Sequence, residues 1–211
     1  MTESSRQETL VLLHGIWMYP VVMSWLAHQL RQLGYEVLTP GYASVHNTPA
    51  QNAKALHAYL QRTVTNERLH IVGHSLGGLV ALHLIDQFND LPPGRLVTLG
   101  SPVAGSYIAR TLKPWPLLGM AFGNSMEGGL SGQGVPVQCQ REWGAICGTL
   151  SVGLGSPLLI GQGVHDGAVC LSETEHPAQK ARLCLAVTHT SMLFSRTVVE
   201  RTHHFLQYGR F

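Results

Sequence analysis

Charged side chains are scarce in this chain of 211 residues. Lys, Arg, Asp and Glu together make up 12% of it, whereas hydrophobic residues make up 45%. An average globular domain carries roughly 25% charged residues, and disorder requires high charge with low hydrophobicity, so a disordered chain is excluded. The net charge is only +2 and there is no stripe of Lys and Arg, so we expect no nucleic-acid partner.

Long apolar runs are absent as well. No segment reaches the roughly 18 unbroken apolar residues of a membrane span. The first eight residues are polar and lack the basic and apolar regions of a signal peptide. From these absences we expect a soluble, cytoplasmic protein.

The four cysteines form no C-x-x-C pair, which argues against a zinc ribbon. Cys184 lies inside the apolar run LCLAV, where we expect a reduced and buried thiol. Four cysteines also allow a disulfide, which the cytoplasmic expectation disfavours.

Strand-like and helix-like segments alternate along the chain. Such alternation predicts an α/β fold, with a mostly parallel sheet of about six strands and helices on both faces. The strand segments are apolar throughout, as is typical of strands covered on both faces. We find no repeat or linker and expect a single domain over 1–211. The predicted strands are 10–13, 35–39, 69–73, 95–99, 143–147 and 183–187, and the predicted helices are 21–33, 49–65, 76–88 and 196–207.

Glycine is concentrated in one part of the chain, since residues 101–167 hold most of the 23 glycines. Between 103 and 140 only Arg110, Lys113 and Glu127 are charged, and the run PWPLLGMAF is apolar. An insertion of this length inside a compact domain is usually functional or mobile. We interpret 103–141 as a cap or lid over an apolar pocket, or alternatively as an irregular piece of core.

The strongest motif is Gly73-His74-Ser75-Leu76-Gly77, a G-x-S-x-G pattern between a predicted strand and a predicted helix. This context is typical of a sharp turn that lifts the serine hydroxyl clear of the sheet. We therefore predict Ser75 as a nucleophile and the Leu76 amide as one donor of an oxyanion hole. His74 leaves the turn in another direction and cannot be the base. We expect it to pack beneath the turn and include it among the candidate pocket residues.

The segment LVLLHGIW supplies a second motif, because a strand that runs into His-Gly can provide the second oxyanion donor. We assign that donor to the Ile16 amide and expect His14 to brace the loop. Trp17 and Met18 follow and are candidate residues of the substrate pocket.

Together these segments resemble the α/β-hydrolase family, and most closely its small bacterial lipases and esterases. The resemblance includes LLHGIW, GHSLGG, LGSPVAGS at 99–106, HDGAV at 165–169 and THTSM at 188–192. It implies a minimal version of the fold that begins at the family's third strand. It also implies that the catalytic serine, aspartate and histidine follow one another in this order along the chain.

The acid is chosen among only three aspartates. Asp86 and Asp90 lie on or just after the helix that follows the serine, away from the strand ends where such sites gather. Asp166 remains, within an Asp-Gly-Ala-Val segment that resembles the family's D-G-x-V pattern. Glu173 and Glu175 are the alternatives.

The base is expected after Asp166, among four histidines. His189 directly follows the predicted strand 183–187, as a loop histidine at a strand end should. His176 precedes a proline in a polar loop, and His203 and His204 fall within the last predicted helix. We therefore predict His189 as the base.

These residues predict a carboxylic ester hydrolase that forms an acyl-serine intermediate and needs no metal or organic cofactor. The expected partner is a small acyl ester of short to medium chain or a lipid, and the apolar 103–140 region is a candidate for transient lipid-surface contact. Thioester, amide and acyl-transfer chemistry of the same fold remain alternatives, as does a non-catalytic binding protein. Nothing in the sequence indicates an oligomeric state.

Overall fold

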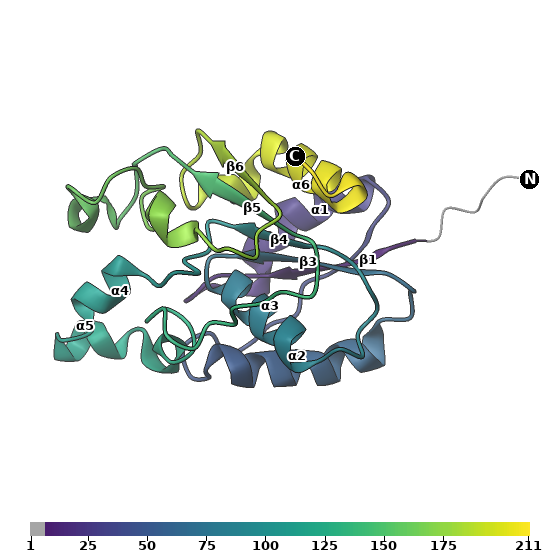
Figure 1. Ribbon diagram of the computed structural model, residues 1–211, viewed down its shortest axis with the longest axis horizontal. Coiled ribbons are helices and arrows are strands. Elements are labelled where there is room, and N and C mark those ends of the chain that lie inside the picture. Colours follow the sequence, from purple (N-terminus) through teal and green to yellow (C-terminus); the bar gives the residue numbers. More distant parts are fainter. Residues whose placement is uncertain (1–6) are drawn as a thin grey trace, which may run out of the picture.

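A computed structural model describes residues 7–211 and contains a six-stranded sheet whose strands all run parallel (Figure 1). The strand order is β2-β1-β3-β4-β5-β6. The strands are β1 (Thr9–Leu13), β2 (Glu36–Leu38), β3 (Leu69–His74), β4 (Leu96–Leu99), β5 (Trp143–Gly148) and β6 (Ala181–Leu185).

Helices cover both faces of the sheet and divide the core into two layers. On one face, α1 (Ser24–Gln32) and α6 (Arg196–Tyr208) pack with the 3-10 turns η1 (Pro20–Met23) and η5 (Ser191–Phe194). On the other, α2 (Pro49–Thr63) packs against α3 (Leu76–Gln87), and nearly all of α3 is buried. Figure 1 shows the two helix pairs on opposite sides of the strands.

Local sequence explains where the main helices begin and end. Thr48 and Gln51 form a reciprocal capping box at the start of α2, and Pro49 occupies its first turn. The Ser195 side chain accepts from the Val198 amide at the start of α6. The helix ends at Gly209, whose φ of 69° lies in the left-handed region that glycine adopts freely.

The α/β fold with six strands is confirmed, and most predicted bounds lie within two residues of those observed. The predicted helix 21–33 begins as the 3-10 turn η1 before α1. The last strand lies two residues earlier than predicted, at Ala181–Leu185.

The expectation of a buried thiol at Cys184 is wrong, because Cys184 is exposed. The reason is that β6 is the edge strand, and its side chains alternate between exposed and partly buried positions instead of being covered on both faces. All four cysteines lie within the described residues and are free thiols.

The strand order also determines where a site can form. From β1 the chain adds β2 on one side and then returns to add β3 on the other, so the loops after β1 and β3 diverge at the centre of the sheet. Ligands of open α/β sheets bind in the crevice at such a point, at the carboxyl ends of the strands.

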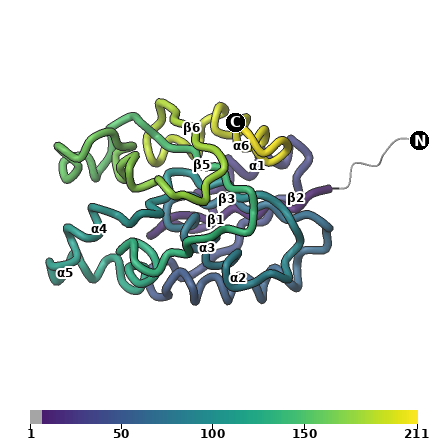
Figure 2. The backbone as a smooth tube through the Cα atoms, viewed as in Figure 1, coloured from purple at the N-terminus to yellow at the C-terminus, as the bar shows by residue number. Residues whose placement is uncertain are grey.

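Two segments extend beyond this end of the sheet. The first carries α4 (Tyr107–Leu112), α5 (Pro116–Met120) and η2 (Gly123–Met126), and the second, 149–164, carries η3 (Ser156–Leu159). Figures 1 and 2 show both segments projecting to the left of the view. None of the helices within 7–211 has the length and apolar character needed to cross a membrane.

Candidate active site

The turn between β3 and α3 holds Ser75 in a conformation that non-glycine residues rarely adopt, with φ of 54° and ψ of −123°. Such strain is found mostly at functional sites, where the surrounding structure maintains it. Here the Ser75 amide donates to the Leu99 carbonyl at 2.9 Å. A Cβ at Gly73 would lie 2.5 Å from the Gly78 amide nitrogen, so the turn can close only around glycine.

Asp166 lies in the loop that follows β5 and is almost completely buried. One carboxylate oxygen, Oδ1, accepts from the amides of Ala168 at 3.0 Å and Val169 at 2.8 Å. The other, Oδ2, lies 2.8 Å from Nδ1 of His189. The His189 amide also donates to the Asp166 carbonyl at 2.7 Å, so side chain and backbone both join the two loops.

The contact with Asp166 determines the tautomer of His189. A carboxylate only accepts, so the imidazole proton must be on Nδ1, and Nε2 keeps a free lone pair. The His189 side chain is 14% exposed and lines the same cavity as Ser75. A neutral imidazole in this tautomer is equipped to accept a proton from a neighbouring hydroxyl.

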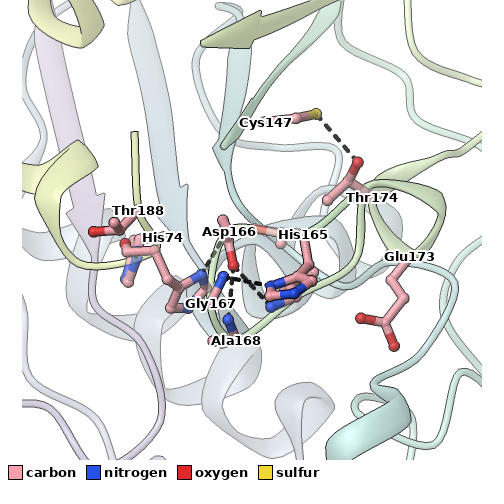
Figure 3. A network of polar contacts seen from close by, with 12 residues as sticks. His74, Cys147, His165, Asp166, Gly167, Ala168, Glu173, Thr174 and Thr188 are labelled. Atoms are coloured by element: carbon pink, nitrogen blue, oxygen red, sulfur yellow. Dashed lines mark hydrogen bonds and ion pairs between the residues drawn. The ribbon is translucent and has the colours of Figure 1, made fainter. Parts of the chain in front are cut away.

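The alternative acids have other partners. The Glu173 carboxylate accepts from the amides of Cys170, at 2.7 Å, and Tyr107, and burial raises the pKa of this carboxyl. Glu175 pairs with Arg182 at 2.8 Å. Figure 3 shows the Ala168 amide beside the Asp166 carboxylate, while the Glu173 carboxyl is turned away.

The remaining candidate histidines also lie elsewhere. His176 packs against the Trp143 ring. His203 contacts the Tyr35 hydroxyl at 3.0 Å, and His204 contacts the Arg210 carbonyl at 2.8 Å, both from α6. None of the three lines the cavity that contains Ser75.

Two side chains, Tyr42 and His14, bond to the backbone of the loop after β1 and hold it in place. The Tyr42 hydroxyl donates to the His14 carbonyl, and its ring stacks on the His14 imidazole at 4.2 Å. The His14 Nδ1–H in turn donates to the Gly15 carbonyl at 2.9 Å. Burial lowers the pKa of His14 and raises that of Tyr42, so both stay neutral and keep these donors.

These contacts determine the direction in which the Ile16 N–H points. In a trans peptide the C=O and the next N–H point in opposite directions, so holding the Gly15 carbonyl against His14 directs the Ile16 N–H the other way. Ile16 and Gly15 both line the cavity. The Leu76 N–H is at the first position of α3, and within the described residues neither it nor the Ile16 N–H has an acceptor.

Ser75 and His189 open on an apolar cavity of about 410 Å³, a size typical of small-molecule sites. None of the described residues that line it carries a formal charge. Its apolar side chains come from the loop after β1, from 103–141, from 149–164 and from the Asp166 loop. They are Ile16, Trp17, Met18, Ile108, Leu112, Phe122, Leu130, Val152, Leu154, Leu158 and Val169.

Two of the three predicted pocket residues lie in this cavity. Trp17 and Met18 line it, and the Trp17 indole N–H donates to the Ala121 carbonyl at 2.7 Å, joining the β1 loop to the segment 103–141. His74 does not line it, and its inclusion among the pocket residues is corrected. Successive side chains of a strand point to opposite faces, and His74, the last residue of β3, is fully buried behind the turn.

Sequence reasoning missed the contribution of 149–164 and of the loop after β2. Val152, Leu154 and Leu158 line the cavity, and Tyr42 and Ser44 support the loop after β1. The uncharged, glycine-rich run SVGLGSPLLIG has the same composition as 103–141 and could have indicated a second part of the cap. No local signal marks Tyr42, because its role depends on a partner 28 residues away.

The chain matches one protein family in sequence and resembles several solved proteins in structure. The sequence model of the Alpha/beta hydrolase family matches residues 10–205. The mature form of the Bacillus licheniformis lipase BlEst2 is similar in structure, with a TM-score of 0.74 and 18% identity over 98% of this chain and 93% of that one. No curated protein is similar enough in sequence to count as a match.

Two other solved structures share the fold at low identity. The metagenomic carboxyl esterase MGS0156 has a TM-score of 0.69 and 17% identity, over 88% of this chain and 65% of that one. The RedJ thioesterase from the prodiginine pathway of Streptomyces coelicolor has a TM-score of 0.65 and 14% identity, over 97% and 86%. At these identities the likeness establishes the fold alone.

Proposed function

Because this chain belongs to the Alpha/beta hydrolase family, we propose that it is a serine hydrolase that cleaves carboxylic esters. Ser75 is the nucleophile, His189 the general base and Asp166 the acid that orients it. The observation that carries this proposal is that a strained serine and an aspartate-bound histidine open on one uncharged cavity.

The proposed reaction uses these three groups in turn. His189 accepts the Ser75 proton on Nε2 as the hydroxyl oxygen attacks the ester carbonyl, and Asp166 stabilises the imidazolium that forms. His189 then returns the proton to the departing alcohol. The acyl-serine that remains is hydrolysed by a water that His189 activates in the same way.

The amides of Ile16 and Leu76 serve as the oxyanion hole. Both are free of other acceptors among the described residues, and the Leu76 amide has the positive end of the α3 dipole behind it. The Gly15 carbonyl is held back by His14, so the Ile16 donor is oriented before the substrate arrives. An oxyanion is therefore stabilised without reorganisation of the loop.

The cavity supports an apolar acyl group as the part of the substrate that it holds. A charged acyl chain would lose its hydration with no partner to replace it, whereas an alkyl chain gains from burial against leucine, isoleucine and phenylalanine side chains. We propose that 103–141 and 149–164 together form the cap over this chain, within one domain. Short- to medium-chain esters are the expected substrates.

Thioesters, amides and acyl transfer remain the alternative chemistry, because the triad determines the nucleophilic step and not the leaving group. A non-catalytic binding role would leave the strain at Ser75 and the bond between Asp166 and His189 without a purpose.

Contact with a lipid surface is a second proposal, supported by exposed apolar side chains on the two cap segments. They include Trp115, Leu117, Leu118, Met120, Val137, Leu150, Val152, Leu154, Leu158, Ile160 and Val164. Four of these side chains fall within residues 115–120, and exposed apolar side chains that gather in this way often mark interaction sites. Sedimentation with phosphatidylcholine vesicles should bring down the wild type but less of a Leu117→Asp variant, and equal sedimentation of the two would count against it.

The proposed function is tested with p-nitrophenyl esters from acetyl to palmitoyl, using the wild type and Ser75→Ala side by side. Turnover by the wild type alone supports the hydrolase, and the optimum chain length measures the depth of the cavity. A fluorophosphonate probe should label the wild type only. If the wild type labels but cleaves no ester, thioester and amide substrates are next, and absence of both activities overturns the proposal.

A further inference from the structure

His74 joins the proposed nucleophile to the proposed base. It immediately precedes Ser75, and its Nε2 lies 2.9 Å from the backbone carbonyl oxygen of His189. A carbonyl only accepts, so the Nε2 proton of His74 must be the donor. The two imidazole rings lie 4.7 Å apart at an angle of 45°.

Several contacts hold the loop that carries His189, since the Leu150 amide donates to the Val187 carbonyl at 3.2 Å and Met192 and Leu193 are fully buried. The His189 amide and its Nδ1 both bind Asp166, so these two bonds fix the base to the acid. Among residues 7–211, the His74 contact is the only hydrogen bond between this loop and the turn that presents Ser75. The bonds to Asp166 do not set the distance of His189 from the serine, so the His74 contact is the direct hydrogen-bonded link between base and nucleophile.

The rest of the His74 environment fits a connecting role. The side chain is fully buried and its Nδ1 has no hydrogen-bond partner. A buried charge without a partner is costly, which favours a neutral ring with its proton on Nε2. Burial, and then the nearby His189, lower the pKa of His74 to about 3. A second positive charge beside His189 would oppose the imidazolium that forms there in each cycle, and the buried neutral ring avoids it.

His74 also contacts the loop that carries the Ile16 amide. A Cβ at Gly15 would lie 3.2 Å from both His74 Nδ1 and Ser75 Cβ, so the glycine allows this close packing. The imidazole therefore lies between the loop after β1 and the loop of the base, directly behind the nucleophile.

We propose that His74 is a positioning residue that holds the backbone of His189 at a fixed distance from Ser75 through its Nε2–H. The inference rests on the proposed function, because it concerns the alignment of the same nucleophile and base. Proton transfer from serine to histidine needs hydrogen-bond geometry, and a misplacement of about 1 Å can cost on the order of a hundredfold in rate. His74 therefore acts on kcat and leaves substrate binding unchanged.

The test compares His74→Gln with His74→Met. Glutamine carries an amide N–H at the same number of bonds from Cα as Nε2 of histidine, whereas methionine places a methyl group there. The two variants are similar in length, so they differ mainly in the donor. For each we would measure kcat and KM on the best p-nitrophenyl ester, the rate of fluorophosphonate labelling, and the melting temperature.

We expect His74→Met to lower kcat and the labelling rate by about tenfold to a hundredfold with KM unchanged, and His74→Gln to recover most of that loss. The downfield proton resonance of the bond between His189 and Asp166 should persist in both variants. Wild-type kcat in His74→Met overturns the proposal, as does an equal loss in both variants or loss of the resonance in His74→Met.

These outcomes are separate from those that test the hydrolase itself. If the wild type and Ser75→Ala are both inert, the proposed function fails and His74 has no base to position. If the wild type is active, Ser75→Ala is inert and His74→Met equals the wild type, only the role of His74 fails.

Discussion

The site has two halves that are built differently. The half at the ends of the strands is held by directional hydrogen bonds: His189 to the Asp166 carboxylate, that carboxylate to the Val169 amide, and His14 and Tyr42 to backbone carbonyls of the loop after β1. The cap half, made of 103–141 and 149–164, lines the cavity almost entirely with apolar side chains, many of them exposed. Hydrogen bonds in the first half are directional, whereas apolar contacts in the second are not, so we expect chemistry and substrate preference to respond separately to mutation.

The largest effect is expected where the proposed chemistry depends on single atoms. Ser75→Ala or His189→Ala should each lower turnover by about a million-fold, by analogy with serine proteases. The exposed Ser172 and His28 lie outside the cavity, so Ser172→Ala and His28→Ala are the controls. Ester hydrolysis measured on all four variants checks this, and activity retained in either site variant would contradict the assignment.

Replacement of Asp166 should lower kcat less than replacement of Ser75 or His189, because the base stays in place. We expect Asp166→Ala to lower kcat by about ten-thousand-fold, while Glu173→Gln, at a carboxyl that accepts from the amides of Cys170 and Tyr107 outside the cavity, keeps most of the rate. Steady-state kinetics on one ester distinguish the two. Full activity in Asp166→Ala would transfer the role of the acid to Glu173 or Glu175.

Loss of the Tyr42 hydroxyl should lower kcat less again, because this group acts on the proposed oxyanion hole only through the loop that carries Ile16. Tyr42→Phe removes the donor to the His14 carbonyl but keeps the ring stacked on the imidazole. We expect kcat to fall by about tenfold with KM unchanged, below the loss of on the order of a hundredfold seen when an oxyanion donor itself is removed. A rise in KM alone would show that the loop contributes to binding instead.

A change in the cap should alter preference and not chemistry. Leu154 is fully exposed and lines the cavity, so Leu154→Asp places a charge beside the proposed acyl chain. We expect several-fold slower hydrolysis of long-chain esters and no change with acetyl ester. An equal loss on every chain length would mean that the two halves of the site are not separable.

The smallest effect concerns stability and not activity at neutral pH. Burial lowers the pKa of His70 to about 4, even though Glu8 lies beside it. Between pH 6.5 and about 4 the unfolded chain binds a proton on this histidine and the folded chain does not, so the free energy of unfolding should fall as the pH falls. Chemical unfolding measured across this pH range checks the prediction, and the free energy of unfolding should fall less steeply with pH in His70→Gln.

The sequence predicted most of the fold because local patterns determine it. Short apolar segments between helical ones, the capping box at Thr48 and the glycines around Ser75 each act over a few residues. The approach of His189 to Asp166 followed from the order of the residues once the family was recognised. Predicted and observed strand bounds differ most at β6, where an edge position weakens the apolar pattern.

The sequence by itself determined the alternation of strands and helices, the strained turn at Ser75 and the choice of candidate acid and base, because these depend on neighbouring residues and chain order. Only the tertiary structure decided that Cys184 is exposed, that Tyr42 supports His14, that 149–164 shares the cavity with 103–141 and that His74 binds the backbone of His189. Each of these depends on a partner far along the chain, and the position of such a partner is set by how the strands assemble.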